Sequence, residues 1–154
     1  MREDTIKLLM ECNSGIKMGY NSINNVIPYT QSKKLEKILD ACKDRHAILG
    51  DKTHKALINN NGNTKAPHAF AQAMADMKVK AVVSFQGNDK AIASVMTDGC
   101  NMGIKSIYKY LNQYKNASVE AKEIANELIS AEQELRTDLR KYLWNLDNLK
   151  VYFL

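Results

Sequence analysis

The stretch that decides the fold reads CNSGIKMGYNSIN at residues 12–24 and returns as CNMGIKSIYKYLN at residues 100–112. Seven of the thirteen aligned positions are identical, at a constant offset of 88 residues. Ordinary amino-acid composition gives roughly one such match by chance. The pattern therefore indicates an internal duplication, with related halves at about residues 5–60 and 89–149.

Composition and charge limit the class of protein. The 154 residues are 45% hydrophobic and 25% charged, which is typical of one globular domain spanning residues 1–154. Two prolines and seven glycines provide too few turn residues for an all-β fold, so an all-α fold is expected. The net charge of +5 comes from lysines interleaved with acidic residues, which argues against nucleic-acid binding.

The cysteines and the apolar runs predict a location. Three cysteines with no paired spacing, and a charged start without an export-type apolar segment, favour reduced thiols in the cytoplasm. Buried, inert thiols are the default interpretation for all three. No apolar run approaches the length of a membrane span, so no membrane association is expected.

Apolar residues at helical spacing predict four long helices. Ser32, Asp89 and Ser118 can each cap a helix, as can Asp4 or Thr5 at the start of the chain. Pro28 ends the first helix and Gly62 ends the second, the glycine in a left-handed conformation. The expected helices cover residues 4–27, 32–59, 89–115 and 118–149.

Two helical hairpins with short turns follow from these positions. A crossover at residues 63–88 joins them and carries a short helix after Pro67, whose Met-rich face packs across the bundle. Short turns make neighbouring helices antiparallel, and the long crossover lets the third helix run parallel to the second. Trp144 is expected to cover the bundle end or a subunit contact.

Four polar residues interrupt the apolar stripes that should face the core. Each lies fourteen residues from a tight turn, which is about 21 Å along its helix, so the four should meet in one cross-section. Two tyrosines lie on the same faces, two turns nearer the hairpin ends. The predicted polar core layer consists of Asn13, His46, Asn101 and Glu132, accompanied by Tyr20 and Tyr108.

With this layer the chain resembles the ferritin-like superfamily, and specifically its uncharacterised bacterial four-helix domains. The resemblance covers nearly the whole chain and implies a layer that binds two metal ions. The family uses one glutamate on each of helices 1 and 3 and Glu-x-x-His on each of helices 2 and 4. Here asparagine replaces both single glutamates, at Asn13 and Asn101. Lys43 precedes His46 where glutamate should stand, and Leu135 follows Glu132 where histidine should stand.

These departures leave one carboxylate where a di-iron site needs about four, so neither ferroxidase nor di-iron oxidase activity is expected. The leading interpretation is a structural layer without metal, in which His46 and Glu132 form an ion pair and both asparagines complete the network. Its alternative is a single transition-metal ion held by His46 and Glu132. A third reading is a small-ligand pocket lined by Tyr20, Tyr108 and the glycines of two Gly-x-x-x-Gly repeats, at 15 and 19 and at 99 and 103.

The expected function is accordingly non-enzymatic: a ferritin-like bundle of unknown role, acting through protein interaction or self-association, with a dimer as the expected assembly. The competing hypothesis is a metal-binding relative of ferritins and rubrerythrins with a remodelled mononuclear site. Asp51 and His54 have the spacing Asp-x-x-His, which could place two metal ligands on one face of a helix. We interpret them as part of a solvent-exposed helix face.

Overall fold

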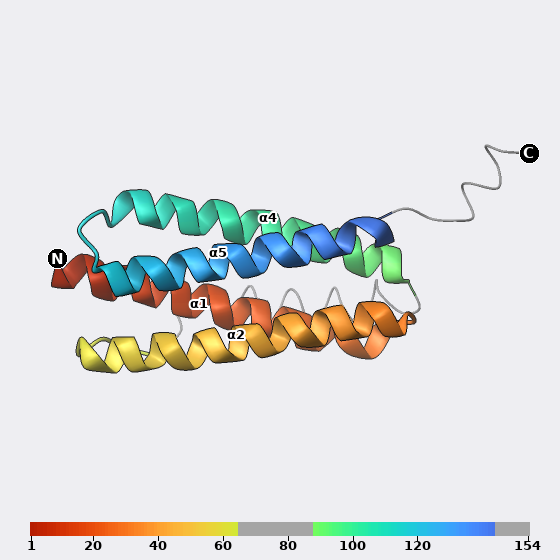
Figure 1. Cartoon of the computed structure of the whole chain (residues 1–154), viewed down its shortest axis with the longest axis horizontal. Coiled ribbons are helices and arrows are strands. Elements are labelled where there is room, and N and C mark those ends of the chain that lie inside the picture. The colour runs from red at the N-terminus through yellow and green to blue at the C-terminus, as the bar shows by residue number, and fades with distance from the viewer. Residues whose placement is uncertain (65–87, 144–154) are drawn as a thin grey trace, which may run out of the picture.

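A computed structural model describes residues 1–64 and 88–143 (Figure 1). Within these ranges the chain forms helices and no strands, which confirms the all-α prediction and the four-helix bundle. The predicted crossover helix and Trp144 lie outside the described residues. The four long helices are α1 (Arg2–Val26), α2 (Lys33–Asn59), α4 (Asp89–Gln113) and α5 (Val119–Leu139), with 3₁₀ turns η1 (Ile27–Tyr29) and η2 (Arg140–Tyr142).

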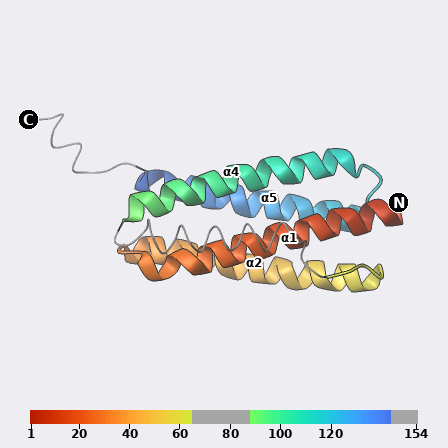
Figure 2. The same ribbon diagram turned by 180° about the vertical axis from the view of Figure 1, so that it is seen from behind.

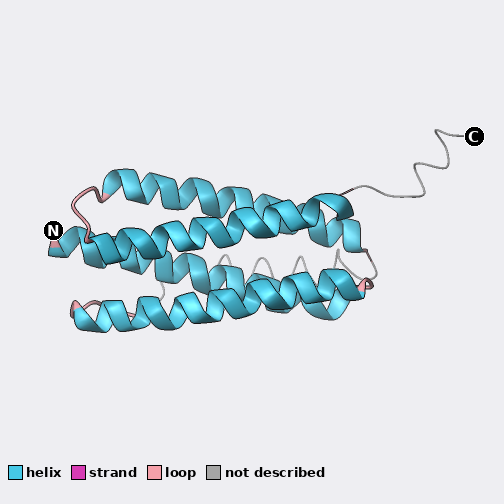
Figure 3. Ribbon diagram, in the orientation of Figure 1, coloured by secondary structure: helices cyan, strands magenta, loops and turns pink. Residues whose placement is uncertain are grey.

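The axes of the four helices are nearly aligned, as Figures 1 and 2 show from opposite sides. α1 and α2 form one antiparallel pair, and α4 and α5 form the other. α4 begins at the end of the bundle where α1 ends, so it runs parallel to α2 (Figure 1). Figure 3 shows the described chain as helices joined by loops. α1 packs against α2, α4 and α5, and α5 packs against α2 and α4 as well. Among the described helices, none combines the length and the apolar character that crossing a membrane would require.

Side-chain caps start three of the helices, because the first amides of a helix have no partner within it. Ser32 accepts from Leu35 N and Ser118 accepts from Ala121 N, as expected. The cap of α4 is Asn88 and not Asp89, which corrects the prediction. α1 begins at Arg2, earlier than predicted, so Thr5 lies inside the helix.

Asp89, Asp4 and Thr5, which were predicted to cap their own helices, instead connect the two hairpins at the ends of the bundle. Asp89 accepts hydrogen bonds from the backbone amides of Gln31 and Ser32, at 2.8 and 2.9 Å, and so ties α4 to the α1–α2 connection. At the other end, Asp4 accepts from Asn116 N at 3.0 Å and the Thr5 hydroxyl accepts from Ser118 N at 2.8 Å. The start of α4 therefore binds the α1–α2 connection, and the start of α1 binds the α4–α5 connection.

Helix ends differ from the sequence expectation in two further places. At the end of α2 the left-handed residue is Asn61, with φ of 56°, while Gly62 donates its amide to Leu57 O. Asparagine tolerates this conformation because its short polar side chain can form hydrogen bonds with nearby backbone groups. α5 ends at Leu139, ten positions before the predicted end, and gives way to the 3₁₀ turn η2.

Two hydrophobic clusters fill the interior, one toward each end. One gathers Leu8, Leu9, Leu57 and Ile124 near the α4–α5 turn, and the other gathers Leu35, Leu39, Ile92 and Leu139 near the α1–α2 connection. All eight side chains are at most 1% exposed. Burial of such side chains supplies most of the stability of a bundle.

Leu39→Ala should lower the free energy of unfolding by about 2–5 kcal/mol, because it removes buried methyl groups and leaves a cavity. The control is Lys55→Ala on the same helix, where the side chain is exposed; its effect should stay within about 0.5 kcal/mol. Urea unfolding followed by circular dichroism measures both. Equal effects from the two variants would contradict the buried position of Leu39.

Candidate functional site

One buried ion pair lies at mid-length in the bundle, between α2 and α5. His46 on α2 is fully buried, and its Nε2 lies 2.7 Å from Oε1 of Glu132 on α5. Its Nδ1 lies 2.8 Å from the backbone carbonyl oxygen of Cys42, one helical turn earlier. A carbonyl oxygen can only accept a hydrogen bond, so Nδ1 carries a proton.

The surroundings of His46 favour its charged form. Burial lowers the pKa of an imidazole, but the hydrogen bonds to Cys42 and Glu132 and the charge of Glu132 outweigh it. Together they raise the pKa of His46 from 6.5 to about 10. The side chain is therefore an imidazolium at neutral pH that donates from both nitrogens, and the Glu132 carboxylate accepts.

A glycine on each of the two remaining helices faces this pair, and Gly19 is the one that makes room for it. A Cβ atom placed on Gly19 of α1 would lie 2.6 Å from His46 Nε2, closer than any real contact. On α4, Gly103 faces the Glu132 carboxylate, with the nearest atom 3.8 Å from its Cβ position. Every helix thus contributes one position to a single layer: Gly19, His46, Gly103 and Glu132.

This layer separates the two hydrophobic clusters. On each helix the layer position lies between a residue of one cluster and a residue of the other. Ile16 and Ile23 flank Gly19, Leu49 and Cys42 flank His46, Ile104 and Cys100 flank Gly103, and Ala131 and Leu135 flank Glu132. The predicted polar layer therefore exists for His46 and Glu132, but its other two members differ.

The prediction that Asn13 belongs to this layer is wrong. Asn13 is buried, yet its Nδ2 donates to the backbone oxygen of Thr64 at 3.2 Å, and Lys17 Nζ donates to the same oxygen at 3.0 Å. The α1–α2 connection is not a symmetric turn, since η1 and the extended backbone after it add length that a residue count from Ile27 ignores. Gly19, six residues beyond Asn13, consequently lies opposite His46.

Asn101 is also wrongly placed by the prediction, for a different reason. It is exposed, and its Oδ1 accepts from the Arg136 guanidinium at 2.9 Å on the bundle surface. Its height along α4 is nearly right, because Cys100 and Gly103 lie beside Glu132. Successive residues point about 100° apart around a helix, so the inward position belongs to Cys100.

The two tyrosines do not line a common interior pocket. Tyr108 is 47% exposed on α4, whereas Tyr20 is partly buried on α1. The proposed ligand pocket of Tyr20, Tyr108 and glycines is therefore wrong as far as Tyr108 is concerned. Of the glycines, Gly99 meets open space and Gly15 touches Leu128 and Ile107 at ordinary distances.

The residues of the layer do not fit the di-metal site that the ferritin resemblance implies. Two ligand atoms on one tetrahedral metal ion lie about 3.3 Å apart, given metal–ligand bonds of about 2.0–2.2 Å. His46 and Glu132 are 2.7 Å apart and bind each other. Lys43 forms an ion pair with Asp40 on the helix surface. The described ranges contain no group of three or more His, Cys, Asp or Glu side chains arranged for a metal ion.

Two buried cysteines belong to the surroundings of the pair, whereas the sequence predicted only that they are buried and inert. Cys42 Sγ lies 3.6 Å from His46 Nδ1. Cys100 faces Glu132 from α4, and burial together with the negative charge of Glu132 raises the pKa of its thiol. The spacing of four between Cys42 and His46 was the available signal, because residues four apart share a helix face.

Comparison with models of protein families, with characterised proteins and with solved structures gives no match to this chain. The site is consequently interpreted from its own geometry.

Gly19→Ala should destabilise the fold by roughly 1–3 kcal/mol, because the added methyl group must displace His46 from Glu132. The matched control is Gly99→Ala on α4, which meets no atom within 4 Å. It should stabilise by up to about 1 kcal/mol, since alanine suits a helix better than glycine. Denaturant unfolding measures both, and stabilisation by both variants would show that Gly19 does not face the pair.

The stability of the fold should fall as pH rises above neutrality. The pKa of His46 is raised from 6.5 to about 10 on folding, so its contribution is complete below pH 6.5 and is lost as pH approaches 10. Between pH 6.5 and about 8.5 the loss should be roughly 2 kcal/mol. Above that range the thiols contribute with the same sign, because burial raises the pKa of Cys12 to about 12.

Urea unfolding at several pH values measures this decline, and His46→Gln should abolish it. His54→Gln on the same helix is the control, because His54 is exposed; the decline should persist in that variant. A wild-type stability that stays constant from pH 6.5 to 8.5 would mean that His46 is neutral in the folded protein.

Proposed function

We propose that this chain is a non-enzymatic, ferritin-like bundle that acts through contacts with other protein chains, and that its polar layer is structural. The observation that carries the proposal is the closed geometry of the layer. Each His46 nitrogen donates to an acceptor within the protein, and the Glu132 carboxylate receives one of these bonds. A layer that satisfies itself in this way fixes the register of the helices.

The order and direction of the helices support the ferritin-like part of the proposal. α1 and α2 are antiparallel, α4 runs parallel to α2, and α5 returns antiparallel to α4 (Figure 1). A long crossover between α2 and α4 would give this order, as it does in ferritin-like folds. The reciprocal contacts made by Asp4 and Asp89 at opposite ends support a duplicated hairpin as its origin.

A second copy of the chain is the first candidate partner. Several large apolar side chains are exposed on the long helices and at the start of α5. Self-association through one face would remove the side chains of that face from water, and closed two-fold dimers are the commonest assemblies of soluble chains. These residues are Ile48, Ile58, Met102, Tyr108 and Val119.

Equilibrium dialysis against Fe²⁺, Mn²⁺ and Zn²⁺ in turn, followed by elemental analysis, tests the structural role of the layer. No metal should be retained in a one-to-one ratio, because His46 and Glu132 saturate each other. His46→Ala serves as the control for nonspecific binding elsewhere on the chain. Stoichiometric metal that His46→Ala removes would overturn the proposal in favour of a mononuclear metal protein.

Sedimentation velocity tests the self-association. The wild-type protein should sediment as a dimer, and Ile48→Glu combined with Met102→Glu should shift it toward the monomer without changing its circular dichroism. Both side chains are more than 60% exposed in the isolated chain, so the double variant should fold normally. A wild-type protein that remains monomeric over the accessible concentrations would contradict a self-associating function.

A further inference from the structure

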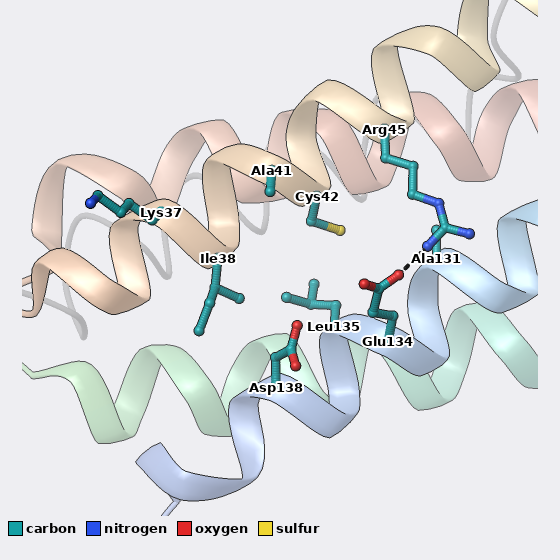
Figure 4. A pocket seen from close by; sticks show the side chains of 9 residues that line it. All are labelled: Lys37, Ile38, Ala41, Cys42, Arg45, Ala131, Glu134, Leu135 and Asp138. Carbon is teal, nitrogen blue, oxygen red and sulfur yellow. Dashed lines mark hydrogen bonds and ion pairs between the residues drawn. The ribbon is translucent and has the colours of Figure 1, made fainter.

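A hollow of about 270 Å³ opens on the surface between α2 and α5, and Figure 4 shows its lining. Cys42 of α2 is among its lining residues, and its side chain lies above Leu135 of α5 in this view. Cys42 is 9% exposed, whereas Cys12 and Cys100 are 0% and 1% exposed. Of the three thiols, only that of Cys42 lines this hollow. The hollow is lined by Lys37, Ile38, Ala41, Cys42, Arg45, Ala131, Glu134, Leu135 and Asp138.

The same thiol contacts an imidazole, which in turn contacts a carboxylate. Cys42 Sγ lies 3.6 Å from His46 Nδ1, and His46 Nε2 lies 2.7 Å from Glu132 Oε1. The imidazolium of His46 therefore lies within contact distance of a sulfur nucleophile. Glu132 keeps the imidazole charged and oriented, as the third group of such an arrangement does.

The other charges around the thiol largely compensate one another. On α5, Glu134 is ion-paired with Arg45 of α2, which also donates to Ser130. Lys37 and Asp138 lie at the exposed rim of the hollow, one positive and one negative. α4 presents the uncharged Cys100 and α1 presents Gly19. The imidazolium of His46 is therefore the charged group in direct contact with Sγ.

The remaining two cysteines lack these features. Burial raises the pKa of Cys12 to about 12, and burial with the charge of Glu132 raises that of Cys100. Both effects suppress the thiolate. The three cysteines of the chain thus differ in exposure, in access to a hollow and in the charge beside the sulfur.

We propose that Cys42 is a modification site, which reacts with low-molecular-mass disulfides that enter the α2–α5 hollow. The Cys42 thiolate attacks one sulfur of the disulfide and a new S–S bond forms. The original S–S bond breaks, and the departing thiolate takes its electron pair and then a proton from solvent. No other oxidant is needed, and the step goes beyond the proposed structural role of the layer.

Reaction of the folded protein with 2,2′-dithiodipyridine at pH 7 tests this site, with peptide mapping to assign each modified thiol. Cys42 should react about 100-fold faster than Cys12 and Cys100, which become accessible only when the bundle opens. Cys42→Ser should remove the fast phase, while Cys12→Ser and Cys100→Ser keep it. Equal rates for the three thiols of the wild-type protein would overturn the proposal.

Two further variants separate activation of the thiol from access to it. His46→Gln should slow the Cys42 reaction by about tenfold, because the positive charge beside Sγ is lost. Ala41→Phe should slow it by a similar factor by filling the hollow from an exposed position. The rates at Cys12 and Cys100 report whether each variant is still folded. An unchanged Cys42 rate in His46→Gln would rule out activation by the imidazolium.

Discussion

The alignment of the helices depends on one charged pair, His46 and Glu132, which is buried among the apolar side chains of the bundle interior. Removing two charges from water is costly, and an ion pair in a core adds little net stability compared with well-packed apolar side chains. What it contributes is specificity. The hydrogen bonds of His46 are all formed only when Glu132 lies opposite its Nε2. Any shift of α2 along α5 therefore leaves a charge without its partner. The pair therefore defines one relative height for these two helices.

The same pair explains the sequence of the other two helices. The imidazole fits at mid-bundle only because Gly19 carries no side chain there, while Gly103 faces the carboxylate at ordinary contact distance. Glycine weakens a helix, and at Gly19 the loss is offset by the space it leaves for His46. On both sides of the layer, ordinary apolar packing resumes in two separate clusters. The interior is thus two apolar halves around a polar centre.

Much of the architecture was readable from the sequence, because helix spacing and caps are local signals. The all-α class, the four helices and the meeting of His46 with Glu132 were all predicted. Asn13 and Asn101 were misplaced because residue counts neither measure the length of a 3₁₀ connection nor fix which side of a helix faces inward. The glycines and Cys42 were visible as patterns, but their role depends on distances of a few ångströms between helices.

The reciprocal bonds at the bundle ends have a consequence for how the chain folds. Those from Asn116 and Ser118 to Asp4 and Thr5 join residues 112 and 113 positions apart, and those to Asp89 span 57 and 58 positions. Long separations raise contact order and slow the search for the native topology. During synthesis the first turn of α1 must wait for residue 118 before its backbone partners exist. The connection of each hairpin forms these hydrogen bonds only with the other hairpin. The two halves should therefore fold and unfold as a single cooperative unit.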